Sequence, residues 1–464
     1  MTKNSLLPLK KNDDIKLDVD SVTGQGCGIG RYEGLAVFVD GALMDEQVYA
    51  HIIKVKSSYA VGKLKSILTP SKDRVEPKCP VYDACGGCTL QHLSYEAQLK
   101  VKQEQVKDAM ERLGGFKDIE VLPIIGMKNP ERYRNKGSFP LGYVDESVEA
   151  GFFKQRSHTL VPLNDCIIQK SKIIQAVNAV TEWANEYGVP PYNEETHEGI
   201  LRHVMVRTTA DEKQVMVVIV TTGPILNVPQ LIEKLKSNIE GLTSIIHNVN
   251  SKVTNVILGD EFDVIWGSDY ITEKINGLKF NVSAASFLQV NPEQTVKLYN
   301  TAINNLGLTG EETVVDVFCG IGTISLLIAK KAKQVVGIEI VKEAIVDAKQ
   351  NARENGIENV EFICADAEEA FPKIASSGTK IDAVMLDPPR KGCDDKTLNA
   401  IINAKIEKVV YVSCNPATLA RDCRLLCDNG YEIKSVQPVD MFPHSGHVES
   451  VVCLKRRLDV DMRR

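Results

Sequence analysis

The sequence predicts a multidomain protein with three parts: a small OB-like β-barrel over residues 1–70, a central α+β domain over 71–285, and a C-terminal α/β domain of the Rossmann-like type over 286–464. Three observations predict it. The 464 residues amount to about three domains of typical length. Short apolar runs between turn residues fill the first part, as in small barrels. From residue 286 onward, apolar strands alternate with amphipathic helices, the pattern of a parallel sheet covered on both faces.

Composition excludes several protein classes. Hydrophobic residues make up 43% of the chain and charged residues 25%, which favours a packed fold over a disordered one. No apolar run approaches the roughly 18 residues of a membrane span, and the N-terminus leads into no secretory apolar core. We therefore expect a cytoplasmic monomer without membrane contact. The net charge of −6 counts against binding of nucleic acid by overall charge, so any RNA must be bound by local patches.

Three runs in the first part predict strands. Residues 15–19 alternate apolar and polar side chains, whereas residues 35–39 and 51–55 are mostly apolar. Glycines punctuate the segment 23–30 between these runs, but no strand-then-helix pattern surrounds them. Turns of a barrel are therefore a better interpretation of these glycines than a phosphate-binding loop.

The twelve cysteines are not expected to form a disulfide framework, because an intracellular compartment keeps thiols reduced. Cys79, Cys85 and Cys88 lie in one short loop with two glycines, and Cys166 follows later. Four thiolates in this pattern suit either a tetrahedral zinc ion or a [4Fe-4S] cluster, and spacing alone does not choose between them. Unligated cysteines in so polar a loop would be open to oxidation, so we predict a metal site.

The central part mixes helices and strands. A helix is predicted over residues 94–113, because apolar side chains recur on one face and two glycines end it. Residues 215–220 predict a strand and residues 228–236 a helix. Two runs, 131–136 and 153–158, interleave basic and aromatic residues as RNA-binding segments do, although such runs are more often solvated surface.

The C-terminal part predicts a site for a nucleotide-like cofactor. Residues 313–317 predict a buried strand that runs into a glycine turn and a helix, a unit in which backbone N–H groups can approach a ligand. A dinucleotide fingerprint needs a third glycine where this chain has Ser325. A pyrophosphate-binding turn is therefore disfavoured.

Acidic residues follow the next three predicted strands. Glu339 ends the second strand, Asp366 lies two residues beyond the third, and Asp387 follows the fourth. Each of them singly could cap a helix, but together they line the edge at which open α/β sheets bind ligands. A site with acids and few basic groups suits an adenosine that carries a sulfonium better than a dinucleotide.

The fifth strand brings a cysteine to the same edge. Residues 408–412 run into Ser413-Cys414-Asn415-Pro416, where a thiol beside a methyl donor can act as a nucleophile. Addition of the Cys414 thiolate to C6 of uracil would activate C5, and the proton on C5 would then need a base. Glu449 is the candidate base, with His447 and His444 ranked behind it.

With these motifs the chain resembles the uracil-C5 RNA methyltransferase family, in particular its members with an N-terminal TRAM barrel and a [4Fe-4S] cluster. The resemblance covers nearly the whole chain. It rests on the four cysteines and on four motifs: Asp316-Val317-Phe318-Cys319-Gly320-Ile321-Gly322, Asp387-Pro388-Pro389-Arg390, Ser413-Cys414-Asn415-Pro416 and His447-Val448-Glu449.

The resemblance implies a role for each site residue. Cys414 and Glu449 match the family's nucleophile and base. The residues that match its iron–sulfur ligands are Cys79, Cys85, Cys88 and Cys166. The residues that would contact S-adenosylmethionine are Gln289, Phe318, Glu339 and Asp387, with Asp366 near the adenine.

The resemblance also implies a substrate. Members that act on the T-loop uridine of transfer RNA usually lack the barrel and the cluster, so we expect methylation of 23S ribosomal RNA of the large subunit. Enzymes of Gram-positive bacteria are the most similar, and some of them modify two uridines. The base must be unstacked for a thiol to reach it, which favours a single-stranded loop.

Four alternatives stay open. The first is a transfer-RNA enzyme, and the second a methyltransferase of cytosine C5, which uses the same thiol addition. An exocyclic-amine methyltransferase could use Asp387-Pro388-Pro389 but would leave Cys414 without a role. The last is an iron–sulfur RNA-binding protein with an inactive catalytic domain, against which the intact Cys414 and Glu449 argue.

Overall fold

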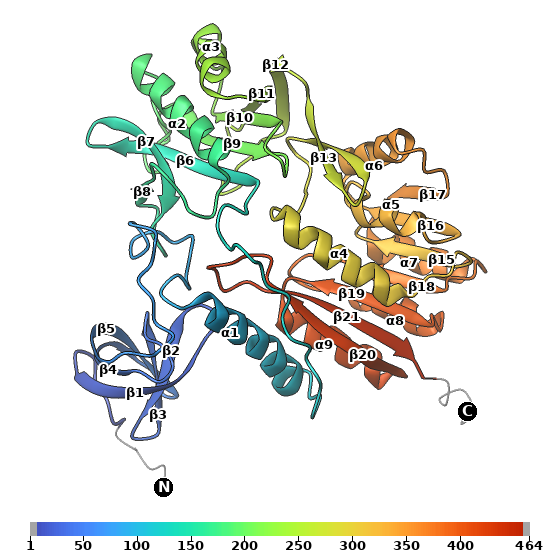
Figure 1. Cartoon of the computed structure of the whole chain (residues 1–464), viewed down its shortest axis with the longest axis horizontal. Helices are drawn as coiled ribbons and strands as arrows, with labels where there is room; N and C mark the ends of the chain where they lie inside the picture. Colours follow the sequence, from blue (N-terminus) through green and yellow to red (C-terminus); the bar gives the residue numbers. More distant parts are fainter. Residues whose placement is uncertain (1–6, 458–464) are drawn as a thin grey trace.

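The structure is a computed structural model that describes residues 7–457. Its strands form a closed five-stranded barrel, two seven-stranded sheets and a two-stranded sheet. In Figure 1 the barrel lies at the lower left, the central sheet above it and the C-terminal domain at the right. No helix within residues 7–457 is long and apolar enough to cross a membrane. The predicted multidomain architecture is confirmed.

The barrel closes in the order β1-β2-β3-β5-β4, and its strands alternate buried and exposed side chains. The glycine-rich segment supplies the second strand of this barrel and no phosphate loop. A Cβ atom on Gly30 would lie 2.1 Å from the Asp18 carbonyl oxygen, so glycine lets the first two strands approach. The strands are β1 (Asp14–Val22), β2 (Cys27–Tyr32), β3 (Leu35–Asp40), β4 (Gln47–Val55) and β5 (Tyr59–Thr69).

The central domain begins with a long helix, α1 (Tyr95–Asp108), which continues into a π-helical turn, η1 (Ala109–Leu113). Its sheet has the order β12-β11-β10-β9-β6-β7-β8, and α2 (Ser171–Glu186) and α3 (Val228–Asn238) pack on one face. The strands are β6 (Lys136–Val144), β7 (Ser147–Phe153), β8 (Leu160–Pro162), β9 (Leu201–Thr208), β10 (Val215–Thr221), β11 (Leu242–Val249) and β12 (Glu261–Gly267).

The other face of this sheet packs toward the C-terminal domain. Met205 and Met216 share a hydrophobic core with residues of that domain. The hairpin β13 (Tyr270–Ile275) and β14 (Leu278–Ser283) belongs to the same core, and Asn281 N donates to Asn351 Oδ1 at 2.8 Å. The hairpin therefore joins the two domains, although the predicted boundary at residue 285 assigns it to the central one.

The C-terminal domain is a seven-stranded sheet with helices on both faces (Figure 1). Five strands are parallel, in the order β17-β16-β15-β18-β19, and β21 pairs antiparallel with β19 and with β20. The strands are β15 (Thr313–Val317), β16 (Gln334–Glu339), β17 (Val360–Cys364), β18 (Ala383–Leu386), β19 (Lys408–Ser413), β20 (Tyr431–Val439) and β21 (Glu449–Arg456).

The helices divide between the two faces of the sheet. Apolar side chains of α4, α5 and α6 pack on one face, and those of α7, α8 and α9 on the other. Since the strand order turns outward from β15 in both directions, the carboxyl ends of β15 and β18 flank a topological switch point, where such sheets bind ligands. The helices are α4 (Pro292–Leu306), α5 (Thr323–Ala329), α6 (Lys342–Glu354), α7 (Ala367–Ser376), α8 (Asp395–Asn403) and α9 (Pro416–Asp428).

Candidate active site

A cavity of about 640 Å³ opens at the carboxyl edge of the C-terminal sheet. Residues that follow β15, β16, β17, β18 and β19 line it, together with residues from the segments that flank α4 and β21. The structure brings into this one cavity all seven residues predicted for cofactor binding and chemistry: Gln289, Phe318, Glu339, Asp366, Asp387, Cys414 and Glu449.

The glycine turn after β15 holds an aromatic ring at the cavity wall. Phe318 has a φ of 74°, a left-handed conformation that costs a residue with a Cβ about 1–3 kcal/mol. Two hydrogen bonds keep it there, since the amides of Phe318 and Cys319 both donate to the Ile338 carbonyl at 2.9 Å. Glu339, at the end of β16, accepts from Gly320 N at 3.2 Å and so fixes the turn from the other side.

The acidic residues differ in what they bind. Asp366 lines the cavity and also caps α7 by accepting from Glu368 N at 3.1 Å. Its carboxylate therefore caps a helix and faces the cavity as well. Burial raises the pKa of Asp387 to about 7. A nearby positive charge would favour its ionised form, which makes this end of the cavity suited to a cation.

Backbone turns fix the position of Cys414. It follows β19 and lies two residues before α9, whose N-terminus favours a nearby negative charge. Asn415 caps that helix by accepting from Ala417 N at 3.1 Å. The Asn415 side chain also donates to the Arg390 carbonyl at 3.0 Å, which ties the cysteine turn to the loop after β18.

Antiparallel pairing brings Glu449 to the end of the sheet where Cys414 lies. In the register of β19 and β21, Val412 pairs with Val451 and Ser413 with Ser450; Cys414 follows Ser413 and Glu449 precedes Ser450. Burial raises the pKa of Glu449 well above its ordinary value. Burial and the nearby Glu449 raise the pKa of Cys414 to about 11, while the positive charge of Arg390 opposes the rise. Both shifts favour the protonated forms of the two groups.

Several lining residues were not predicted, or were ranked second. His447 lies at the wall, where burial lowers its pKa and keeps the ring neutral. Phe442 lies beside it, with the two ring centroids 6.0 Å apart. Arg390 also lines the cavity, as the last residue of the Asp387-Pro388-Pro389-Arg390 motif. The other predicted histidine, His444, is not among the lining residues.

The loop 440–448, which precedes Glu449, is held by hydrogen bonds to α1, whose C-terminal end packs in the core of the C-terminal domain. Lys102 of α1, fully buried, donates to Asp440 and to the Phe442 carbonyl, the latter at 2.9 Å. Tyr95 donates to the other Asp440 oxygen at 2.8 Å. These contacts hold in place the segment that carries two lining residues of the cavity, Phe442 and His447.

The cysteine loop contacts the same segment. The amides of Thr89 and Leu90, which directly follow Cys88, donate to the His444 carbonyl at 2.9 and 3.0 Å. Tyr133 donates to the Pro443 carbonyl at 3.0 Å. The barrel reaches it as well, because a Cβ atom on Gly446 would lie 1.9 Å from the Gly24 carbonyl oxygen. The absence of a side chain on Gly446 thus permits close contact between the barrel and this loop.

The four predicted cysteine ligands surround a second, small cavity of about 20 Å³. Burial is the main cause that raises the pKa of Cys85, of Cys88 (to about 12) and of Cys166. Electrostatic repulsion from Cys79 also raises the pKa of each of these three thiols, so the four cysteines lie close together. Within residues 7–457, no group of three or more His, Cys, Asp or Glu side chains is arranged to hold a single metal ion.

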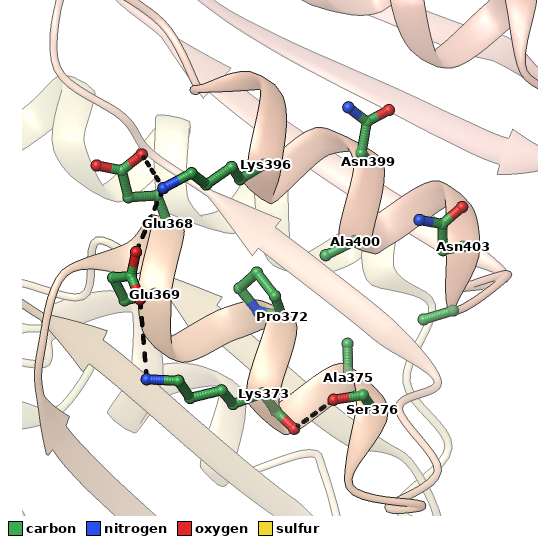
Figure 2. Close-up of a pocket in the computed structure, with 11 residues that line it drawn as sticks. Glu368, Glu369, Pro372, Lys373, Ala375, Ser376, Lys396, Asn399, Ala400 and Asn403 are labelled. Atoms are coloured by element: carbon green, nitrogen blue, oxygen red, sulfur yellow. Dashed lines mark hydrogen bonds and ion pairs between the residues drawn. The ribbon is translucent and has the colours of Figure 1, made fainter.

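A further hollow of about 530 Å³ lies between α7 and α8 and contains none of the predicted site residues. Figure 2 shows that its charged side chains face one another. Lys396 pairs with Glu368 and Glu369 at 3.4 and 3.3 Å, and Lys373 pairs with Glu369 at 3.8 Å. Because these charges neutralise one another across the hollow, it lacks the features of a site for a charged ligand.

Comparisons with known proteins agree with this arrangement. A family model described as tRNA (uracil-5-)-methyltransferase matches residues 94–457, and a TRAM domain model matches residues 9–65. A Halalkalibacterium halodurans protein described as an uncharacterized RNA methyltransferase is 48% identical over 449 residues, 97% of this chain and 98% of its own. A Clostridium tetani protein of the same description is 48% identical over 449 residues, 97% of each chain.

A solved structure extends the likeness to three dimensions. The tRNA (uracil-54, C5)-methyltransferase of Pyrococcus abyssi, in complex with S-adenosyl-L-homocysteine, is similar with a TM-score of 0.77 and 26% identity. The alignment covers 95% of this chain and 100% of that one. Its bound ligand is what remains of S-adenosylmethionine after methyl transfer.

Proposed function

The chain belongs to the tRNA (uracil-5-)-methyltransferase family of S-adenosylmethionine-dependent RNA methyltransferases, and from this premise we propose that it methylates C5 of a uridine in 23S ribosomal RNA. One observation carries the proposal of C5 chemistry. Cys414 and Glu449 lie at the same end of the β19–β21 pair and line the same acidic cavity. A nucleophile and a base on opposite sides of one ring are what this chemistry requires.

The cofactor would occupy the end of the cavity that follows β15, β16 and β18. Glu339 lies at the end of β16, where a carboxylate accepts hydrogen bonds from ribose hydroxyls. Asp366 would lie near the adenine, and Phe318 and Gln289 would contact other parts of the cofactor. Asp387 would lie near the sulfonium, whose charge favours the ionised carboxylate.

Cys414 would begin the reaction. Its thiol gives up a proton to water, and the sulfur adds to C6 of the uracil, which leaves C5 as a carbon nucleophile. S-adenosylmethionine supplies the methyl group that C5 takes. Glu449 then removes the proton from C5, the electron pair restores the C5–C6 double bond, and the bond from C6 to sulfur breaks to free the thiolate.

The charge of the sulfonium would set the order of the proton transfers at Cys414 and Glu449. Cys414 and Glu449 both have raised pKa values, mainly through burial. A bound sulfonium would lower both pKa values and favour the thiolate. Once the methyl group has moved, that positive charge is gone, so the pKa of Glu449 rises again and the carboxylate becomes a stronger base for the C5 proton.

Two substitutions test the chemistry with labelled S-adenosylmethionine and RNA transcripts. Cys414→Ala should abolish formation of 5-methyluridine while cofactor binding, measured by calorimetry, stays near wild type. Glu449→Gln should leave the methylated base attached to Cys414, so a protein–RNA adduct accumulates on denaturing gels. Cys27→Ser, in the barrel, is the matched control and should keep full turnover. Turnover of Cys414→Ala near the control would exclude the covalent route.

The choice of RNA rests on the resemblance to ribosomal RNA enzymes of Gram-positive bacteria. Transfer RNA is the second candidate, because the Pyrococcus enzyme, named for uracil 54 of tRNA, aligns over 95% of this chain. The presence of a barrel therefore does not separate the two substrates. Nucleoside mass spectrometry of 23S and transfer RNA transcripts, each incubated with the protein, separates them: methylation confined to transfer RNA would overturn the ribosomal assignment.

We further propose that Cys79, Cys85, Cys88 and Cys166 hold the [4Fe-4S] cluster that the resemblance implies. Their convergence on one small cavity supports it, because buried thiolates need positive charge nearby. The cluster would supply no step of methyl transfer, which moves no electron. Anaerobically purified protein should contain iron and sulfide in equal amounts and lose both in Cys88→Ser, whereas zinc in place of iron would contradict the assignment.

A further inference from the structure

Three cations lie together where the central sheet meets the C-terminal domain. Lys136 of β6 pairs directly with Arg207 of β9, so both side chains lie on the same face of the sheet. That face also carries Met205 and Met216, which pack into the core shared with the C-terminal domain. Arg134 precedes β6 by two residues, and its charge acts on Lys136.

These cations lack the acidic partners that their neighbours have. Within residues 7–457, no carboxylate forms an ion pair with Arg134, Lys136 or Arg207, whereas the adjacent Arg132 donates to both oxygens of Asp165. Arg207 is 1% exposed and donates to the Ser286 carbonyl at 2.6 Å. The Nε atoms of Arg134 and Arg207 are buried without an acceptor among the described residues.

The nearby carboxyl group does not neutralise them. Glu273 attracts Arg207, but it accepts hydrogen bonds from the amides of Ala210 and Lys274, at 2.8 and 2.9 Å. Burial raises the pKa of Glu273. Burial and the charges of Arg207 and Arg134 lower the pKa of Lys136 to about 7. Three basic groups thus share a poorly solvated place, and a bound anion would favour their charged forms.

The cluster borders the active-site cavity. Asn135, which lies between Arg134 and Lys136, donates from its amide to the Val290 carbonyl at 2.9 Å, next to the lining residue Gln289. Arg207 holds the Ser286 carbonyl in the same segment. The charge of Arg134 also reaches His447 on the cavity wall. An anion bound here would lie beside whatever occupies the cavity.

We propose that Arg134 and Lys136, supported from behind by Arg207, bind a backbone phosphate of the RNA strand beside the target uridine. This inference rests on the proposed function, because it needs an RNA whose flipped base enters the cavity. A phosphodiester in this place would anchor the strand while the base leaves the stack. It would also concentrate RNA affinity in a protein whose net charge is −6.

Salt dependence of RNA binding tests the inference. Arg134→Gln and Lys136→Gln are compared with Lys213→Gln, which removes an exposed cation already paired with Asp211 at 3.5 Å. Affinity for a fluorescent single-stranded RNA is measured by anisotropy over a salt series. Each cluster substitution should weaken binding roughly tenfold and lower the slope of log Kd against log salt by about 0.7. Lys136→Arg should keep the slope.

Two outcomes would overturn the inference. One is a slope in both cluster variants equal to that of Lys213→Gln. The other is a loss of S-adenosylmethionine affinity with RNA affinity intact, which would assign the cluster to the carboxylate of the cofactor. Failure of the proposed function looks different: wild-type protein would bind RNA with the expected salt dependence and yet form no 5-methyluridine.

Discussion

Replacement of Lys102 by methionine should loosen the active-site loop 440–448 without touching the cavity. Lys102 and Asp440 both have fully buried side chains, and burial lowers the pKa of Lys102 against the attraction of Asp440. Methionine fills a similar volume but leaves the Asp440 carboxylate with Tyr95 as its remaining side-chain donor. Loss of one partner of a buried ion pair costs about 3–5 kcal/mol, because the other charge stays buried.

The size of this effect sets the assay. A cost of about 3–5 kcal/mol is a factor of roughly 10² to 5 × 10³ in the local opening equilibrium. Hydrogen exchange of the amides in residues 440–448, followed by mass spectrometry, reports that equilibrium directly. The matched control is Arg112→Met, which removes an exposed pair with Asp108 at 3.2 Å from the same helical segment. Exposed pairs contribute about 0.5 kcal/mol, so exchange in the control should change roughly twofold at most.

A double variant sharpens the test. In Lys102→Met/Asp440→Leu neither charge of the buried pair remains, so part of the lost protection should return, although the Phe442 carbonyl loses one of its donors and the Tyr95 hydroxyl loses its acceptor. Turnover should fall with loop protection across the series, because Phe442 and His447 line the cavity. If exchange in the loop rose no more in Lys102→Met than in Arg112→Met, the ion pair would not be what holds the loop.

Two predictions concern pH. Since burial and Glu449 raise the pKa of Cys414 to about 11, alkylation of Cys414 by iodoacetamide in ligand-free protein should keep accelerating as pH rises toward that value. The alkylation rate is measured by peptide mass spectrometry, and a plateau near neutral pH would contradict this expectation. Since burial raises the pKa of Asp387 to about 7, its neutral form predominates in more acidic solution, and S-adenosylmethionine should bind more weakly there than in alkaline solution. S-adenosylhomocysteine, which lacks the sulfonium charge, should respond less, and Asp387→Asn should remove the difference. Calorimetry that found the same pH dependence for both ligands would refute the electrostatic role.

The placement of the acidic residues could be predicted from sequence because parallel strands leave little freedom. Once the strands before Glu339, Asp366 and Asp387 are identified, their carboxyl ends must share an edge. The left-handed backbone at Phe318 could not be predicted, since nothing in its residue type favours a positive φ. Nor does periodicity tell which core a hairpin joins, and β13 and β14 pack with the C-terminal domain.

Charged residues show a similar limit. The sequence places Arg132, Arg134 and Lys136 in one basic run, but Arg132 is neutralised by an aspartate 33 residues away and the other two are not. Lys102, which is fully buried, lies in a helix whose sequence does not distinguish it from the other lysines there. Partners distant in the sequence decide these cases, and a single sequence does not name them.

The placement of Cys414 and Glu449 at one edge of the sheet illustrates both what the sequence predicts and what it leaves open. The sequence placed Cys414 at the carboxyl edge because β19 is a parallel strand, but Glu449 starts a strand that runs the other way. In an antiparallel pair, the end of one strand lies beside the start of the next, so a residue at the beginning of β21 reaches the edge that Cys414 occupies. The loop 440–448 leads into β21 and so places Glu449 at the carboxyl edge of the sheet. Contacts with α1, with the cysteine loop and with the barrel hold this loop in place. A catalytic domain alone would keep the strands but lose these contacts, which explains why the three parts pack around one short segment.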